Sequence, residues 1–221
     1  KKENYPKLEY SIYYFDKPLR VGNYRLGLSF AGHLASGMEG FYLSSYKNNS
    51  KTKYMAVTQF ESTKARMAFP CFDEPRAKAT FDMKVARTED WVTLFNTPVS
   101  YTEPVQGMEG WVWDVFETTP IMSTYTMALA IQDFSFIPAA NNMSVWAQSN
   151  YIEAGYADYA ALVGPQCVSA VESLYNVPYT LPKMDMVHVN NFGGAMENWG
   201  LILYEFDYLL YDDSKEDPEN D

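Results

Sequence analysis

The most constraining feature of the sequence is a period-two hydrophobic pattern that recurs through residues 1–149. In residues 24–30 and again in residues 81–85, apolar side chains alternate with polar or small ones. Because successive side chains of a β-strand point to opposite faces, this alternation predicts half-buried strands. Further apolar runs, separated by prolines and glycines, occupy residues 91–95, 111–116, 125–131 and 143–147. An aromatic content of 16% also favours β-structure, so we expect residues 1–149 to form an antiparallel β-sandwich or saddle.

A different period begins near Glu153. Apolar residues then recur at steps of three and four, the spacing of an amphipathic helix, at Val163, Cys167, Val168, Val171, Leu174 and Tyr175. Pro165 lies within this stretch, so we expect the helix to kink or to start afresh there. Strand character returns at residues 184–189 and 201–206, on either side of a glycine loop. These features predict a second, α/β domain at residues 150–221, incomplete because about 70 residues are too few to close a core around the helix.

The chain is strongly acidic, with 17 basic and 28 acidic residues and a net charge of −11. Much of the acid lies in the last ten residues, which we expect to form a solvated tail. A chain of this charge without a basic stripe is poorly suited to bind nucleic acid or an anionic membrane surface. There is no run of 18 or more apolar residues, and residues 1–10 lack the apolar core of a signal peptide. We therefore expect this segment neither to span a membrane nor to carry its own targeting signal.

The two cysteines and two glycosylation sequons bear on the compartment. Cys71 and Cys167 form no metal-binding motif, and either two buried thiols or one long-range disulfide would account for them. Asn48 and Asn142 each begin an Asn-x-Ser triplet in a polar, turn-like stretch. Two such triplets favour a secreted or cell-surface protein.

Gln59 and Glu61 are the first candidates for a functional site. They follow an apolar strand and lie two residues apart, so they share one face. Two polar side chains on one face could bind a ligand, although a solvated strand edge would look the same. Residues 69–75, in which two prolines bracket apolar and acidic residues, predict a rigid structural turn instead.

Residues 193–200 (GGAMENWG) are the second candidate. Two glycines and an alanine allow another backbone to approach closely, which a strand edge needs in order to accept an extended peptide as an added strand. Glu197 would place a negative charge beside that edge. The alternative is a glycine turn with an exposed carboxylate.

Residues 194–198 also carry a family resemblance, because GAMEN is the exopeptidase signature of the M1 family of zinc aminopeptidases. Four further segments are similar to that family in order and approximate spacing: residues 58–61 (TQFE), 65–75 (ARMAFPCFDEP), 119–125 (TPIMSTY) and 178–183 (PYTLPK). The resemblance covers essentially the whole chain. It implies a β-saddle N-terminal domain at residues 1–149 and the start of a thermolysin-like catalytic domain at residues 150–221.

The resemblance also implies roles for individual residues. Glu197 would bind the free α-ammonium of a peptide substrate, and Glu61 would be a second ammonium contact. Gln59 would line the pocket for the first side chain. Gly194, Ala195 and Met196 complete the implied substrate-binding segment, with the glycine and alanine touching the substrate backbone. A carboxylate suits this task because charge-assisted hydrogen bonds distinguish an ammonium from an internal amide.

The zinc site of the family is not found in this segment. Its His-Glu-x-x-His helix would supply the Zn²⁺ ligands and the general base, and we expect both beyond Asp221. The only histidines, His33 and His188, stand outside such a motif and are predicted to lie in a loop and in a strand. We therefore expect no metal ligands in this chain, which by itself would be inactive.

Together these features predict part of a zinc metallo-aminopeptidase that removes N-terminal residues from peptides. Its expected partners are peptides with a free N-terminus, the rest of the catalytic domain and, in a homodimer, a second copy through C-terminal domains. The sequons and the similarity to aminopeptidase N-like members favour the extracellular side of a membrane-anchored protein, the cytoplasm being the alternative. Two other functions fit less well: an inactive peptide-binding or receptor module of the same fold, and an adhesion module.

Overall fold

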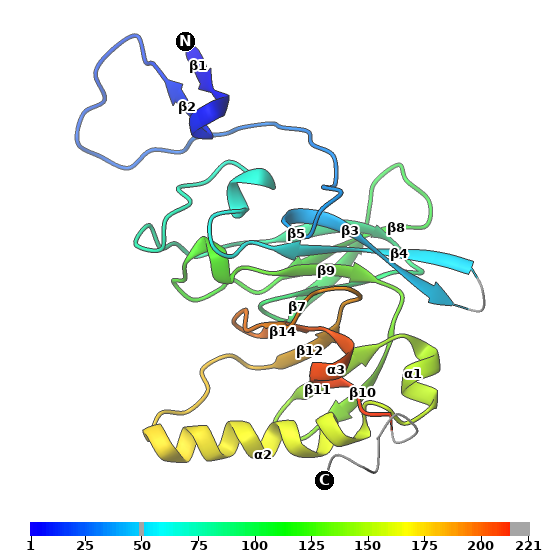
Figure 1. The fold of residues 1–221 in the computed structure, drawn as a ribbon. Coiled ribbons are helices and arrows are strands. Elements are labelled where there is room, and N and C mark those ends of the chain that lie inside the picture. The colour runs from blue at the N-terminus through cyan, green and yellow to red at the C-terminus, as the bar shows by residue number, and fades with distance from the viewer. Residues whose placement is uncertain (49–50, 213–221) are drawn as a thin grey trace.

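Stacked β-sheets form the centre of the structure, and the long helix α2 runs along their lower side in Figure 1. The structure is a computed structural model that describes residues 1–48 and 51–212. Residues 49 and 50 of the first sequon and nearly all of the acidic tail lie outside the described residues. The predicted fold class, mainly β with an α/β portion following it, is confirmed.

The first part of the chain forms two antiparallel sheets. The four-stranded sheet has the order β3 (Gly40–Asn48), β4 (Lys51–Gln59), β9 (Leu129–Gln132) and β6 (Val92–Phe95). The three-stranded sheet has the order β5 (Lys84–Thr88), β8 (Trp111–Phe116) and β7 (Val99–Pro104). The 3₁₀ turns η2 (Ala65–Met67) and η3 (Thr124–Thr126) lie in the connections. The strands predicted at residues 91–95 and 111–116 are confirmed.

A mixed five-stranded sheet follows. Its order is β10 (Ser135–Ala139), β11 (Met143–Ala147), β12 (Met184–His188), β14 (Leu201–Tyr204) and β13 (Ala195–Met196). β11 and β12 are parallel, with Met143 opposite Met184, and β12 and β14 are also parallel. The domain boundary expected at residue 149 therefore falls between strands that share one sheet.

The hydrophobic core lies between the four-stranded and the five-stranded sheets. Tyr42 and Val57 from the first sheet pack in one cluster with Val187 and Leu203 from the second. Every residue of β12 is buried, because its alternate side chains face opposite layers. Val187 belongs to the cluster between the sheets, and Met186 belongs to the cluster that packs under the helices.

The helices cover the other face of the five-stranded sheet: α1 (Ser149–Glu153), α2 (Asp158–Tyr175) and α3 (Phe206–Leu209). α2 continues through Pro165 and does not start afresh, so one lost hydrogen bond is tolerated in a helix that packs on a sheet. Gly164 allows the close approach, since a Cβ there would lie 3.0 Å from the Met186 methyl group. None of the helices in the described part of the chain is long and apolar enough to cross a membrane.

The predicted apolar face of α2 is only partly correct. Val163 and Val168 are half-buried, whereas Val171, Leu174 and Tyr175 are exposed. Small residues near the start of the helix make the contact with the sheet instead, and they include Ala157, Ala160 and Ala161. The periodicity identified the helix, but the sheet lies under its first half only.

The strand predicted at residues 24–30 is absent. These residues have no regular secondary structure, and Tyr24, Leu26 and Phe30 are more than half exposed. Alternation predicts a two-faced strand, but a strand forms only where another strand accepts its backbone hydrogen bonds, and none among the described residues pairs here. The chain before them forms a separate hairpin of β1 (Lys2–Tyr5) and β2 (Tyr10–Tyr13) around the 3₁₀ turn η1 (Pro6–Leu8).

Candidate functional site

The glycine-rich segment lies at one edge of the five-stranded sheet. β13 is the terminal strand and pairs with β14, with Ala195 opposite Tyr204 and Met196 opposite Leu203. No strand in the described part of the chain pairs with the other edge of β13. An edge of this kind presents unpaired backbone N–H and C=O groups to an extended chain. The segment therefore has the geometry that strand addition requires.

Glu197 follows β13 directly, and its side chain is exposed. Its neighbours Met196 and Asn198 are buried, so the backbone is held on both sides of the carboxylate. Glu197 makes no hydrogen bond or ion pair with any residue that the structure describes. Its charge does reach Tyr204, whose pKa is raised first by burial and then by Glu197.

Glu205 closes the loop that precedes β13. Gly193 and Gly194 both have positive φ angles, +81° and +134°. The Gly193 N–H donates to the Glu205 carboxylate at 3.2 Å, and the Glu205 N–H donates to the Gly194 carbonyl at 2.7 Å. Burial would raise the pKa of Glu205, but backbone hydrogen bonds from Gly193, Phe206 and Phe192 outweigh it and lower that pKa. The loop shape is therefore set without Glu197.

Gln59 is the last residue of β4, and Glu61 follows two positions later. Glu61 is exposed and has no hydrogen bond or ion pair with a described residue. The Oε1 atom of Gln59 is buried and has no hydrogen-bond partner in the described structure. Since a buried acceptor without a partner costs free energy, this oxygen is available to a ligand donor.

One hydrophobic cluster connects the two candidate segments. Phe60, which lies between Gln59 and Glu61, belongs to a buried cluster with Phe95 and Phe116, and Trp199 packs against the same cluster. Residues 59–61 and 197–199 are thus brought to the same core although they are far apart in the chain. This convergence could not be predicted from spacing alone.

Three acids in or beside these sheets differ from Glu61 and Glu197, because each pairs with a basic side chain. Asp114 pairs with Arg87 at 2.5 Å, Asp133 pairs with Lys53, and Asp185 pairs with Lys183 at 2.6 Å. These acids are used in folding. The two candidate carboxylates are not, so they can meet a cation from outside.

The turn at residues 69–75 has the structural role that was predicted. Asp73 is buried and accepts hydrogen bonds from Arg66 N and Nε at 3.0 and 3.1 Å, and from Thr124 Oγ1 at 2.6 Å. The Arg66 Nη2 group also donates to the Asp73 carbonyl. These bonds fix the chain that follows Glu61.

The cysteines are both free, which excludes a disulfide between them. Cys71 is half-buried, and burial raises the pKa of its thiol to about 11. Cys167 is exposed on α2, so the expectation of two buried thiols is wrong for this residue. The next residue, Val168, packs on the cluster under the helices, whereas the Cys167 side chain lies on the exposed side of α2.

The histidines lie in a loop and in a strand, as predicted. His33 is exposed, and His188 at the end of β12 is 1% exposed. Its ring contacts Phe134, Tyr151 and Phe206, and burial lowers its pKa to about 4. Among residues 1–48 and 51–212, no three His, Cys, Asp or Glu side chains are grouped to bind a metal ion.

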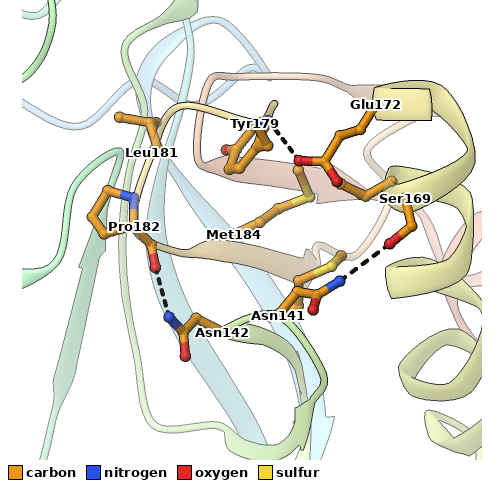
Figure 2. A pocket seen from close by; sticks show the side chains of 10 residues that line it. Asn141, Asn142, Ser169, Glu172, Tyr179, Leu181, Pro182 and Met184 are labelled. Carbon is orange, nitrogen blue, oxygen red and sulfur yellow. Dashed lines mark hydrogen bonds between the residues drawn. The ribbon is translucent and has the colours of Figure 1, made fainter. Parts of the chain in front are cut away.

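A cavity of about 400 Å³ lies elsewhere, between the start of β11, α2 and residues 179–184. Figure 2 shows that its polar groups are already engaged: Asn141 with Ser169, Asn142 with the Pro182 carbonyl, and Glu172 with Tyr179 N. None of the predicted substrate-binding residues lines it. Asn142 itself is exposed at its rim, whereas Met143 of the same sequon is buried in β11.

Two buried polar residues beside the glycine-rich segment were not singled out individually from the sequence. Asn96 donates to the Trp199 carbonyl, and Lys183 donates to the Gly200 carbonyl. Lys183 lies in the matched stretch at residues 178–183, whereas no pattern marked Asn96. Asn96 and Trp199 are 103 positions apart and Lys183 and Gly200 are 17 apart, and only the tertiary structure reveals that they meet.

Two protein-family models match the chain. Residues 1–126 match the peptidase M1 N-terminal domain, and residues 159–221 match the peptidase family M1 domain. The chain therefore belongs to peptidase family M1, with its N-terminal domain followed by the start of its catalytic domain. This confirms the family that the GAMEN segment indicated.

The chain is similar to several curated aminopeptidases. Aminopeptidase A of Gloydius brevicauda is 38% identical over 221 aligned residues, which cover 98% of this chain and 23% of that protein. Aminopeptidase N of Bos taurus is 36% identical over 96% of this chain and 23% of its own length. Endoplasmic reticulum aminopeptidase 2 of Bos taurus is 40% identical over 86% and 20% respectively. The chain thus spans about a quarter of these relatives.

Zinc, on which metallopeptidases of this family generally depend, does not fit the described residues. The two histidines lie in different parts of the fold, and His188 is enclosed by aromatic rings. Glu61 and Glu197 are carboxylates without an accompanying histidine. No step at a metal is therefore assigned to the described residues.

Proposed function

We propose that this chain supplies the part of a metallo-aminopeptidase that recognises the free α-amine of a peptide substrate. Glu197 is the principal ammonium contact, Glu61 is a second one, and Gln59 lines the pocket for the first side chain. The observation that carries the proposal is an exposed carboxylate that has no partner among the described residues and lies between two buried neighbours at the end of an open strand edge.

Strand addition and charge pairing act together in this proposal. The N-terminal residues of the peptide lie along β13, where Gly194, Ala195 and Met196 provide the backbone contacts. The ammonium then meets Glu197, which limits how far the chain can slide and so fixes the cleavage register. A peptide that lacks the charged amine leaves Glu197 without its partner, and the site thereby distinguishes a free N-terminus from a blocked one.

The experiment is Glu197→Ala in the full-length protein, assayed with a free-amine amino-acid anilide and its N-acetylated counterpart. Loss of a charge-assisted contact of about 1.5 to 3 kcal/mol predicts roughly ten- to hundredfold weaker use of the free-amine substrate. The preference over the acetylated substrate narrows because the free-amine activity falls. Glu197→Asp is also impaired, since its carboxylate is about one methylene short.

The control is Glu74→Ala, which removes another exposed carboxylate in the family-matched turn. Glu74 pairs with Arg76 on the surface, so this change should alter kcat/KM by less than twofold. A folded Glu197→Ala protein with wild-type activity and preference would remove Glu197 from substrate recognition.

In the whole protein, zinc held by residues outside this chain would polarise the scissile carbonyl and activate water. The names of the relatives support peptide hydrolysis from the N-terminus. A receptor module of the same fold without activity is the alternative. A His-Glu-x-x-His motif within about 30 residues after Asp221, together with zinc-dependent activity, would decide for the enzyme.

For location we propose the extracellular side of a membrane, with the cytoplasm as the alternative. The accessible Asn142 supports this, as does Asn48 at the end of β3. Glycopeptide mass spectrometry on protein from its native source tests it. Glycan at either asparagine supports the extracellular location, and two unmodified sites contradict it.

A further inference from the structure

We propose that Lys183 and Asn96 are positioning residues that hold the segment carrying Glu197 against the N-terminal domain. They bind the successive carbonyls of Trp199 and Gly200, two and three residues after Glu197. This inference rests on the proposed role of Glu197 and goes beyond it, because it names what sets the position of that carboxylate.

Lys183 connects three parts of the fold through one ammonium group. Its Nζ atom donates to the Gly200 carbonyl at 2.8 Å, to the Phe95 carbonyl at the end of β6, and to Asp185 Oδ2 at 2.6 Å. An ammonium has three donors, so all are used. The side chain is only 14% exposed.

Asp185 makes this buried ammonium tolerable. One carboxylate oxygen accepts from Lys183, and the other accepts from Trp146 Nε1 at 2.9 Å. Burial lowers the pKa of Lys183, while the charge of Asp185 opposes that effect. Removing the lysine would leave a carboxylate that is 11% exposed without its cation, which is a costly change.

Asn96 is the second anchor, and it is fully buried. Its Nδ2 group donates to the carbonyls of Trp199 at 2.7 Å and Thr126 at 2.9 Å, and its Oδ1 accepts from Ala128 N at 2.9 Å. Next to it, Gly200 has φ +83°, and a Cβ there would lie 2.1 Å from the Asn96 carbonyl oxygen. Only glycine allows this approach.

These contacts bear on recognition because they fix the end of the segment nearest to Glu197. The other end is held by Glu205, which bonds to Gly193 and Gly194. Between the two attachments the chain is short, so a shift at Gly200 is passed to the carboxylate. Misplacing a substrate-binding group by about 1 Å can cost a factor of about one hundred in rate.

A purely structural role is the alternative, and the chain contains a matched pair to test it. Arg87 and Asp114 form another buried ion pair, with side chains 17% and 3% exposed, in the β5-β8-β7 sheet. Within the described part of the chain, neither residue forms a hydrogen bond or ion pair with residues 193–200, and neither has a place in the proposed site. Arg87→Met and Lys183→Met each leave a buried carboxylate without its cation.

The experiment compares Lys183→Met, Lys183→Arg and Arg87→Met in the full-length protein. Each is assayed well below its unfolding temperature with the free-amine anilide and its N-acetylated counterpart. Both methionine variants are expected to unfold at lower temperature. Only the Lys183 variants should lower kcat/KM for the free-amine substrate, by tenfold or more, and narrow the preference for a free amine. Arg87→Met should stay within twofold of the wild type in both measures.

Lys183→Arg keeps the charge beside Asp185, so it provides a folded test if Lys183→Met does not fold. A guanidinium cannot place its donors as the ammonium does, and the preference should still fall at least threefold. Asn96→Ser provides a second test through the other anchor, with the same direction of change.

Glu197→Ala in parallel separates the two proposals. If it impairs recognition while folded Lys183→Arg and Asn96→Ser keep the wild-type preference within twofold, the positioning role is overturned and the function of Glu197 stands. If Glu197→Ala itself has no effect, both are overturned. If Lys183 acts on recognition only through Glu197, the Glu197→Ala/Lys183→Arg double variant should lose no more of the preference for a free amine than Glu197→Ala alone.

Discussion

Single residues of this chain divide into those that hold the fold and those left free for a ligand. Asp73, Asp114 and Asp185 are buried and fully engaged, whereas Glu61 and Glu197 are exposed without partners in the described structure. Burial of an acid demands a partner, since an unpaired buried charge is costly. An exposed acid needs no partner in the fold. Glu197 differs from an ordinary surface acid because the residues on either side of it are buried, which holds its backbone in place.

His188 predicts a pH dependence of stability at the residue scale. Its pKa is about 4 in the folded chain and about 6.5 when unfolded, so the unfolded state binds more protons between these values. The stability is therefore fully present above pH 6.5 and falls as the pH drops from 6.5 to 4, by about 3 kcal/mol.

The measurement is urea unfolding of the wild type and His188→Phe across pH 4 to 7.5. The variant should lose less stability on acidification, so the two curves converge or cross towards pH 4. Equal slopes in this range would show that His188 is not buried in its neutral form.

At the scale of elements, β13 shows how little regular structure the site needs. The strand has only two residues. Glu205 bonds to Gly193, which precedes the strand, and Asn96 bonds to Trp199, which follows it, and these bonds hold the strand on both sides. A longer edge strand would invite non-specific pairing. Under the proposed function, a short, anchored strand would restrict strand addition to the end of a peptide.

The contact between α2 and the sheet predicts the effect of changing Gly164. A Cβ would lie 3.0 Å from the methyl group of Met186 and 3.4 Å from that of Met143, and both are flexible ends. Gly164→Ala should therefore be nearly neutral, since about 1 kcal/mol of helix propensity offsets the crowding. Gly164→Leu overfills the contact and should destabilise by about 1 to 3 kcal/mol.

Circular dichroism during thermal unfolding measures both changes. A Gly164→Leu protein as stable as the wild type would show that α2 does not pack closely on β11 and β12. Leu162→Ala, on the exposed side of the same helix, is the control and should shift stability by about 0.5 kcal/mol or less.

The whole molecule depends on the core shared by the four-stranded and the five-stranded sheets. Leu203 is completely buried there with Val57 and Tyr42. Leu203→Ala should cost about 2 to 5 kcal/mol, because it removes packed atoms and leaves a cavity. Since both sheets contribute to this core, both should lose protection together.

Amide hydrogen exchange in β4 and β12 tests that prediction. Protection should fall in both strands in Leu203→Ala and in neither in Leu43→Ala, which changes an exposed leucine of β3. Loss of protection in β12 alone would show that the two sheets fold independently.

The sequence by itself determined the local elements and the candidate groups. Apolar runs between prolines and glycines identified β6, β8 and β11, and the change of period identified α2. GAMEN indicated both the family and Glu197. The strand and helix inferences hold because they depend on residues only a few positions apart, where steric preference and side-chain direction decide, and the role of Glu197 stays a prediction.

Only the tertiary structure decided which surfaces meet. It left residues 24–30 without a strand partner and placed Val171 and Leu174 in solvent, although their patterns resembled buried ones. It also joined Asn96 to Trp199, 103 positions apart. Such pairings depend on packing between distant parts of the chain, which local periodicity does not encode, and they hold the edge of β13 and its carboxylate in place.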